Sequence, residues 1–286
     1  MSAVQSPRPT EIAAAPGDVP RAGSALSDVW VIARRGLVHM RRQPEVLADV
    51  TIQPVMFVLL FAYVFGGAIA VPDGGDYKEF LMGGIFAQTI VFTCFGVAMG
   101  LAADRGNGAI DRFRSLPIAR GAVLGGHALA NVIKTILPIV LMALCGLLVG
   151  WRPNGSVLDT LGGFGLMFAF SFAMIWVGVL MGSVLSSPEA VQGVTFTVLF
   201  PLTFIASTFV PTQTLPGVLR TIAEWNPTSS LADGLRSLFG NPGGIAPVDG
   251  PWSLQHPVLY TLIWVVGIIA VCAPLAISRY QRSITD

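Results

Sequence analysis

Charged residues are scarce in this 286-residue chain, and their scarcity excludes most soluble classes of protein. Asp, Glu, Lys and Arg make up 12% of the chain, hydrophobic residues make up 53%, and the mean hydropathy is +0.70. A soluble domain carries about 25% charged residues. The net charge is +1 and the arginines are spread over several segments, so the sequence indicates no nucleic-acid partner. The composition is that of a protein embedded in the lipid bilayer.

Catalytic and metal-binding patterns are also missing from the sequence. A P-loop needs a Gly-Lys pair before Ser or Thr to hold phosphates, but Lys78 follows Tyr and Lys134 follows Ile. The three histidines are isolated, and neither HExxH nor GxSxG occurs. Cys94, Cys145 and Cys272 lie inside apolar runs without disulfide or zinc spacing. We therefore expect no catalytic residue, no metal and no cofactor on this chain.

Six apolar stretches have the length of about 20 residues that a membrane-spanning helix needs. They cover residues 52–71, 80–103, 126–150, 159–185, 191–210 and 257–278. The pattern predicts an all-α integral membrane fold in which residues 44–286 form one six-span domain. Residues 1–25, rich in Pro and Ala, are predicted to be a disordered tail.

Residues 26–43 have an apolar stripe that carries Trp30 and is surrounded by arginines. This pattern favours an amphipathic helix at the membrane surface, and packing on another protein is the alternative.

The positions of Lys and Arg predict the orientation in the membrane. With both termini in the cytosol, the cytosolic segments hold 12 of these residues and the outer loops hold four, including Arg236. Cytosolic loops of membrane proteins are enriched in Lys and Arg, so both termini are predicted to be cytosolic. Lys134, inside the third span, either snorkels to the interface or has a direct role in transport, and its place near the edge favours snorkelling.

The charged segment 104–120, DRGNGAIDRFRSLPIAR, separates the second and third spans. Residues 109–116 suffice for about two helical turns, and Pro117 ends them. Ile110, Phe113 and Leu116 fall on one side at helical spacing, and Asp111, Arg112 and Arg114 point elsewhere. A short amphipathic helix of this kind suits docking into a groove of a soluble partner. An ordinary positive-inside loop is the alternative.

Three separated blocks of the sequence resemble the membrane subunits of bacterial type-2 ABC exporters, and the likeness is greatest to the branch for daunorubicin and doxorubicin resistance. IDRFRSLPIAR resembles the coupling segment of that family, and residues 52–68 resemble the start of its first span. The third block, residues 200–216 followed by 226–236, resembles its fifth span and outer loop. The blocks occur in the family's order between about residues 26 and 279.

The resemblance implies a permease subunit in the bacterial plasma membrane that acts as an ATP-driven exporter. Two copies of this chain would join two copies of a separate ATPase subunit, which binds ATP and Mg²⁺. The substrate would be an amphipathic, anthracycline-like drug or a lipid-like molecule. An integral-membrane enzyme or a scaffold without transport activity is the alternative, and the missing catalytic pattern weakens the enzyme.

The resemblance also weights the candidate site residues. The second and fifth spans of the resembled fold line the dimer seam, which favours a group of aromatic and polar side chains as the substrate pathway: Phe92, Phe196, Phe200, Phe204, Thr197 and Gln88. Flat polycyclic drugs bind well to stacked apolar rings. Contact with lipid or with another helix is the alternative for each of these residues.

The outer loop, residues 211–256, is predicted to form two short helices at 215–223 and 228–238, separated at Asn226 and Pro227. The resemblance to the exporter family favours a cap that re-enters the membrane over the exit, and a plain surface loop is the alternative.

Overall fold

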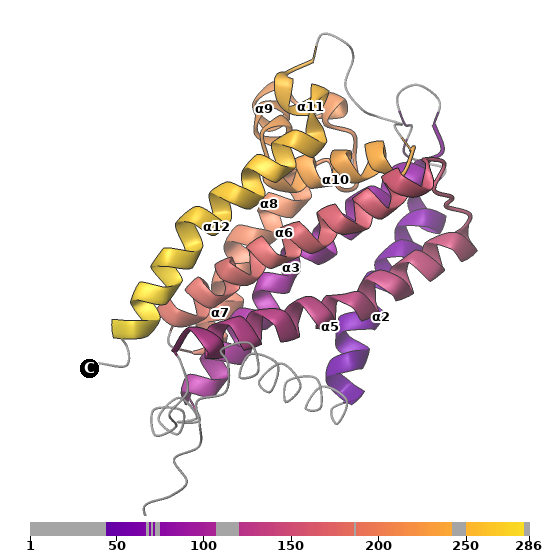
Figure 1. Ribbon diagram of the computed structural model, residues 1–286. Helices are drawn as coiled ribbons and strands as arrows, with labels where there is room; N and C mark the ends of the chain where they lie inside the picture. The colour runs from indigo at the N-terminus through magenta and orange to yellow at the C-terminus, as the bar shows by residue number, and fades with distance from the viewer. Residues whose placement is uncertain are drawn as a thin grey trace, which may run out of the picture.

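The computed structural model describes residues 44–66, 69, 71, 75–106, 120–185, 187–241 and 250–282, and every regular element in these ranges is helical. Figure 1 shows a bundle of long helices with several short helices gathered at one end. The long elements are α2 (Pro44–Leu60), α3 (Tyr77–Gly106), α5 (Arg120–Val149), α6 (Val157–Val184) and α12 (Pro257–Arg282). The short elements are η1 (Phe61–Phe65), α7 (Pro188–Val194), η3 (Thr195–Leu199), α8 (Phe200–Ile205), η4 (Thr212–Thr214), α9 (Gly217–Glu224), α10 (Pro227–Leu238) and α11 (Trp252–Gln255). We call the end that carries α9, α10 and α11 the capped end.

Five described helices are long and apolar enough to cross a membrane. They cover Tyr77–Ala103, Asn131–Val149, Val157–Val184, Pro188–Ile205 and Pro257–Arg279. The first predicted span corresponds to a shorter apolar helix, Ile52–Phe65. The apolar helix begins at the predicted residue and ends at Phe65 rather than at residue 71, and α2 itself extends back to Pro44 with Pro54 inside it. The all-helical membrane fold is confirmed, and the count of six spans stays a prediction.

The helix pair α3 and α6 forms the centre of the bundle, and two glycines of α6 let the backbones approach closely. A Cβ atom on Gly178 would lie 2.5 Å from the carbonyl oxygen of Cys94, and one on Gly182 would lie 2.9 Å from that of Ala98. Helices in membranes associate through such small residues, because lipid provides no hydrophobic force to drive them together.

The predicted fifth span is built from three short elements rather than one regular helix. Ser187 caps α7 by accepting a hydrogen bond from the amide of Ala190, and Pro188 occupies the first turn. Residues 195–199 form one π-helical turn before α8 begins. The span ends at Ala206, where the backbone becomes extended (φ −66°, ψ 167°). Segments of π-helix inside α-helices occur frequently at functional sites.

The two short helices predicted in the outer loop are present as α9 and α10, with Asn226 and Pro227 at the boundary between them. The predicted tail and interfacial helix (residues 1–43) lie outside the described residues. So do residues 107–119, which contain the predicted coupling residues Ile110, Asp111, Arg112, Phe113, Arg114, Leu116 and Pro117. α3 ends at Gly106 and α5 begins at Arg120, both at the end opposite the cap, so the chain passes between these helices there (Figure 1).

Candidate functional site

The helix α10 is a short element whose residues Thr228–Arg236 are all buried, among α3, α6, α12 and the end of α8. Its beginning is fixed by Asn226. The side-chain oxygen of Asn226 accepts a hydrogen bond from the amide of Thr228 (2.8 Å), and its side-chain nitrogen donates to the carbonyl oxygen of Leu202 in α8 (2.7 Å). Pro227 occupies the first helical position, where its missing N–H costs nothing. Asn226 therefore caps α10 and ties it to the fifth span.

Arg236 lies at the centre of this region with 0% of its surface exposed. Its Nε donates to the carbonyl oxygen of Phe80 at the start of α3 (2.8 Å). One terminal nitrogen donates to Asp233 Oδ1 (2.6 Å) and Ser207 Oγ (3.1 Å), and the other donates to the carbonyl oxygens of Ser207 (2.6 Å) and Thr208 (3.5 Å). A guanidinium group has five N–H donors, so each one has an acceptor here.

We call Arg236, Asp233 and Ser207 the buried hub. It joins α10, the start of α3 and the end of α8. The guanidinium carbon also lies 3.6 Å from the centre of the Phe80 ring, in the geometry of a cation–π contact. Gly84 in α3 makes room for the hub, because a Cβ atom there would overlap the carbonyl oxygen of Thr208.

The charges of the hub are compensated inside the protein. Asp233 Oδ1 accepts from the Ser207 hydroxyl (3.0 Å) as well as from Arg236, and its residue is 3% exposed. Burial raises the pKa of the Asp233 carboxyl and lowers the pKa of the Arg236 guanidinium, and the attraction between the two groups opposes both shifts. The N–O distance of 2.6 Å is shorter than that of an ordinary N–H···O bond, as expected for a charge-assisted bond between an ionised pair.

A row of phenylalanine rings starts on the exposed face of the fifth span and ends in the first helix. We call it the aromatic ladder. The centres of successive rings are separated by 6.1 Å (Phe196 to Phe200), 4.3 Å (Phe200 to Phe204), 5.1 Å (Phe204 to Phe209), 4.2 Å (Phe209 to Phe61) and 5.9 Å (Phe61 to Phe57). Phe196, Phe200 and Phe204 are 55%, 38% and 40% exposed, whereas Phe209 is buried. Three rings are thus accessible from outside the bundle and continue into its interior.

The ladder and the hub meet where the fifth span ends. Phe209 follows Ser207 by two residues, and its carbonyl oxygen accepts a hydrogen bond from the hydroxyl of Tyr77 at the start of α3 (3.1 Å). The same irregular turn therefore positions a ring of the ladder and the carbonyl groups that Arg236 binds. A shift of α3 against α8 would change both.

Comparison with known proteins identifies the chain. The family model described as ABC-2 type transporter matches residues 27–239. The chain belongs to the ABC-2 type transporter family. It is 31% identical to the daunorubicin resistance ABC transporter permease protein DrrB1 of Streptomyces coeruleorubidus, over 93% of this chain and 90% of that protein. It is 25% identical to the probable doxorubicin resistance ABC transporter permease protein DrrC of Mycobacterium tuberculosis, over 96% and 97%. It is 26% identical to the putative transport permease ycf38 of Porphyra purpurea, over 76% and 75%.

The family resemblance seen in the sequence is thereby confirmed, and the chain is a multi-pass membrane permease subunit of an ABC-2 transporter. Among the described residues, no group of three or more His, Cys, Asp or Glu side chains is placed to hold a metal ion.

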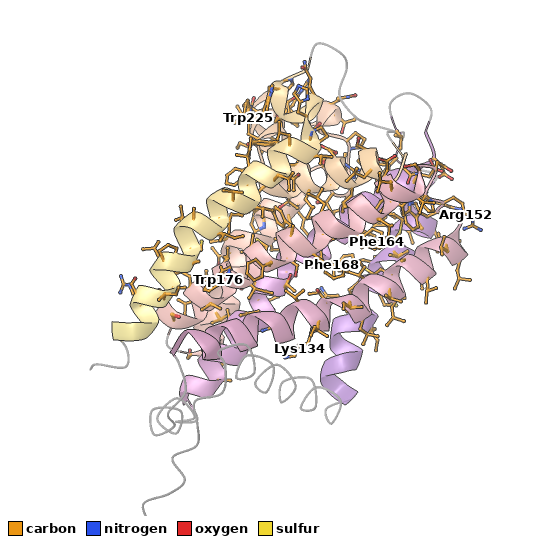
Figure 2. The ribbon with its side chains drawn as sticks, viewed as in Figure 1. Lys134, Arg152, Phe164, Phe168, Trp176 and Trp225 are labelled. Carbon is orange, nitrogen blue, oxygen red and sulfur yellow. The ribbon has the colours of Figure 1, made fainter. Side chains whose placement is uncertain are left out.

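The permease brings together only part of the predicted substrate-pathway set. Phe196, Phe200 and Phe204 lie on the ladder, and Thr197 is exposed on the same span. Phe92 is half-buried and Gln88 is buried in α3, and no described ring of the ladder contacts Phe92. Lys134 is half-buried in α5 (Figure 2).

The sequence did not predict the buried hub, and Arg236 was considered only as a positive charge of an outer loop. Two local signals point to it in hindsight. The first is the i,i+3 spacing of Asp233 and Arg236, which is that of a helical ion pair. The second is that Leu231 and Leu235 alternate with these charged residues along the same short helix. The partners Ser207 and Phe80 are 29 and 156 residues away from Arg236, and no local pattern indicates them.

Proposed function

We propose that this permease exports amphipathic polycyclic drugs or lipid-like molecules across the bacterial plasma membrane, driven by a separate ATPase subunit. The observation that carries this proposal is the aromatic ladder with its three accessible rings. Flat apolar rings stack on such side chains, and drug-binding sites are mostly apolar with few polar groups. The names of two relatives, which describe daunorubicin and doxorubicin resistance, support the same class of substrate.

Two copies of the chain enclose the pathway in this proposal. The exposed face of the fifth span presents Val194, Phe196, Val198, Phe200 and Phe204, which is an apolar face without a covering helix among the described residues. A two-fold axis beside this span places the ladders of both copies on opposite sides of one seam. Thr197 lies on the same span and is exposed, so a single cysteine at Thr197 should form a cross-linked dimer in membranes. Failure to cross-link at any position of residues 191–204 would contradict this seam.

The ATPase subunit, which holds ATP and Mg²⁺, is proposed to dock on the segment 104–120. This segment connects α3 to α5 at the end opposite the cap, and the proposal assigns that end of the bundle, with both termini, to the cytosol. Phe113 and Leu116 are the proposed apolar anchors, with Asp111, Arg112 and Arg114 fixing the orientation by charge. Phe113→Ala should weaken association by about 2 kcal/mol, or about 30-fold in the dissociation constant.

A pull-down of the ATPase subunit tests that docking site. Phe113→Ala should lose both the ATPase subunit and drug-stimulated ATP hydrolysis while the permease still inserts into the membrane. Arg112→Glu should do the same, and more strongly at low salt, because exposed charges are screened at high salt. Normal binding by both variants would show that the segment is only a positively charged loop.

Drug efflux from cells that contain both subunits tests the ladder. Phe200→Ala removes the ring that contacts both Phe196 (6.1 Å) and Phe204 (4.3 Å). A drug ring stacked on Phe200 would lose about 0.5–1.5 kcal/mol, so efflux should fall roughly two- to tenfold. Phe172→Ala is the matched control, because Phe172 is also 38% exposed but contacts only Trp176 among the described rings. Equal effects of the two variants would remove the ladder from the substrate pathway.

A further inference from the structure

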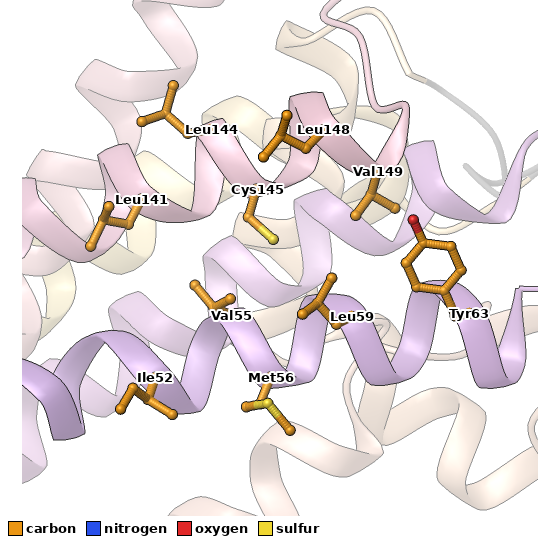
Figure 3. A pocket seen from close by; sticks show the side chains of 10 residues that line it. All are labelled: Ile52, Val55, Met56, Leu59, Tyr63, Leu141, Leu144, Cys145, Leu148 and Val149. Carbon is orange, nitrogen blue, oxygen red and sulfur yellow. The ribbon is translucent and has the colours of Figure 1, made fainter.

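A long apolar groove of about 550 Å³ runs between α2 and α5. Figure 3 shows the lining residues, of which Val55 and Leu59 on α2 and Cys145 on α5 are directed toward the facing helix. Its walls include Val55, Met56 and Leu59 on α2 and Leu141, Leu144 and Cys145 on α5. The residues of each wall recur at helical spacing, so each helix turns one continuous apolar stripe toward the groove.

The length of the groove matches one leaflet of a bilayer. Eleven helical steps separate Ile52 from Tyr63, which corresponds to about 16 Å at about 1.5 Å per residue. Half of the hydrocarbon core is about 15 Å thick. The Tyr63 hydroxyl is the one oxygen-bearing side-chain group in the lining, and it lies at the end of the groove beside Val149, where α5 ends (Figure 3).

Two cations flank the end of the groove near Tyr63. The Lys78 ammonium nitrogen lies 5.9 Å from the centre of the Tyr63 ring. On the other wall, Arg152 follows the last residues of α5 and donates from one terminal nitrogen to the carbonyl oxygens of Leu147 (2.6 Å) and Trp151 (2.8 Å). The guanidinium group has further N–H donors beyond this nitrogen, so it can bind an anionic group at the same time.

Two carboxylates share this end of the bundle, and each has a donor from the protein. Asp76 Oδ1 accepts from the backbone amide of Lys78 (3.0 Å), and Glu79 Oε1 accepts from the side-chain amide of Asn154 (3.0 Å). The mouth of the groove thus has a tyrosine, two cations and two carboxylates that already accept hydrogen bonds from the protein. Tyrosine and basic side chains at this depth are typical of the contact zone with lipid headgroups.

We propose that the groove binds one acyl chain of a phospholipid from the leaflet at the capped end, with the lipid phosphate between Lys78 and Arg152. A flat drug fits less well, because this lining offers Tyr63 as its one aromatic side chain, whereas the aromatic ladder offers several stacked rings. A helix of a second copy also fits less well. Such a helix is about 10–12 Å wide with its side chains, and the apolar face that it turned toward the groove would also cover Lys78 and Arg152. The bound acyl chain would contact α2 and α5 at once, and would add to the direct contacts between these two helices.

Photo-crosslinking tests this site. The full-length permease is placed in nanodiscs with a phospholipid that carries a diazirine in the middle of one acyl chain, and labelled peptides are counted by mass spectrometry. Leu144→Trp fills the groove and should lower adducts on α2 and α5 at least about fivefold, equivalent to about 1 kcal/mol. Ile263→Trp on α12 is the control, because Ile263 is 51% exposed, Leu144 is 52% exposed, and both lie near the capped end of their helices. Met56→Trp repeats the test from the other wall if Leu144→Trp does not insert.

The double variant Lys78→Gln/Arg152→Gln tests the contact with the lipid headgroup. It should lower labelling by the phospholipid about threefold or more, equivalent to about 0.7 kcal/mol, and should leave labelling by a diacylglycerol with the same chain unchanged. Adducts spread evenly over α2, α5 and α12 would overturn the proposal in favour of ordinary boundary lipid. Displacement of the adducts by an anthracycline would overturn it in favour of a drug site.

Discussion

Replacing Arg236 by methionine should destabilise the permease more than any other single change in the outer region. The substitution keeps the apolar stem of the side chain but removes all five N–H donors of the hub. It leaves the Asp233 carboxylate, 3% exposed, without its cation, and it takes the donors away from the carbonyl oxygens of Phe80 and Ser207. Breaking a buried ion pair by removing one partner costs about 3–5 kcal/mol.

A double-mutant cycle separates the interaction of Arg236 with Asp233 from the cost of losing either charge alone. Asp233→Leu alone should also be costly, because it leaves a buried guanidinium unpaired. The double variant Arg236→Met/Asp233→Leu removes both charges, and such replacements are often close to neutral. A double-mutant cycle should therefore give a coupling free energy of about 2 kcal/mol or more between the two residues.

The ion pair of Arg220 and Glu224 on α9 provides the matched control. Its N–O distance is 2.7 Å, against 2.6 Å for the hub, but 41% of the Arg220 side chain is exposed. Exposed pairs contribute about 0–1 kcal/mol, so Arg220→Met should have little effect. The assay is reversible unfolding of the purified permease in mixed micelles with increasing denaturing detergent. A cost for Arg236→Met no larger than that for Arg220→Met would refute the view that the hub holds the outer region together.

Three further predictions concern packing, capping and topology. Gly178→Val should prevent close packing of α3 on α6 and lower stability by several kcal/mol in the same assay, because its Cβ would lie 2.5 Å from a backbone oxygen, whereas Gly193→Val meets no atom within 4 Å and should be tolerated. Asn226→Ala should lose the cap of α10 and its bond to α8, lowering stability by about 2 kcal/mol and reducing efflux at matched expression; unchanged efflux would make this region a passive loop. A cysteine at Ser283 should react with a cytosolic reagent and one at Gly155 with an external reagent, and the reverse pattern would overturn the predicted orientation.

The sequence predicted those elements whose causes are local. The break at Asn226 and Pro227 was visible because a capping side chain followed by proline marks a helix start through contacts within a few residues. The apolar stretches predicted the helices of the bundle for the same reason, since length and hydrophobicity are properties of each segment alone. The apolar pattern did not indicate that α2 extends back to Pro44 with Pro54 inside it, because a proline is tolerated inside a membrane helix when neighbouring groups satisfy the freed carbonyl.

The site was predicted only in part, because its remaining contacts are distant in the sequence. Helical spacing drew attention to Phe196, Phe200 and Phe204, but nothing in the pattern indicated that Phe209 would stack on Phe61 at 4.2 Å. Arg236 was counted by its charge, although its burial depends on carbonyl groups that an irregular turn exposes at the end of α8. Irregular backbone at membrane depth needs partners from elsewhere in the chain, and a single sequence does not show which residues supply them.

The central claim is that this permease moves an aromatic drug when a separate subunit hydrolyses ATP. The most direct measurement is anthracycline transport in proteoliposomes that contain the permease and its cognate ATPase subunit, followed by the quenching of drug fluorescence after ATP is added. The account predicts ATP-dependent accumulation of the drug in inside-out vesicles that is abolished by Phe113→Ala and reduced by Phe200→Ala. ATP hydrolysis by the bound ATPase subunit without any ATP-dependent movement of the drug would contradict it.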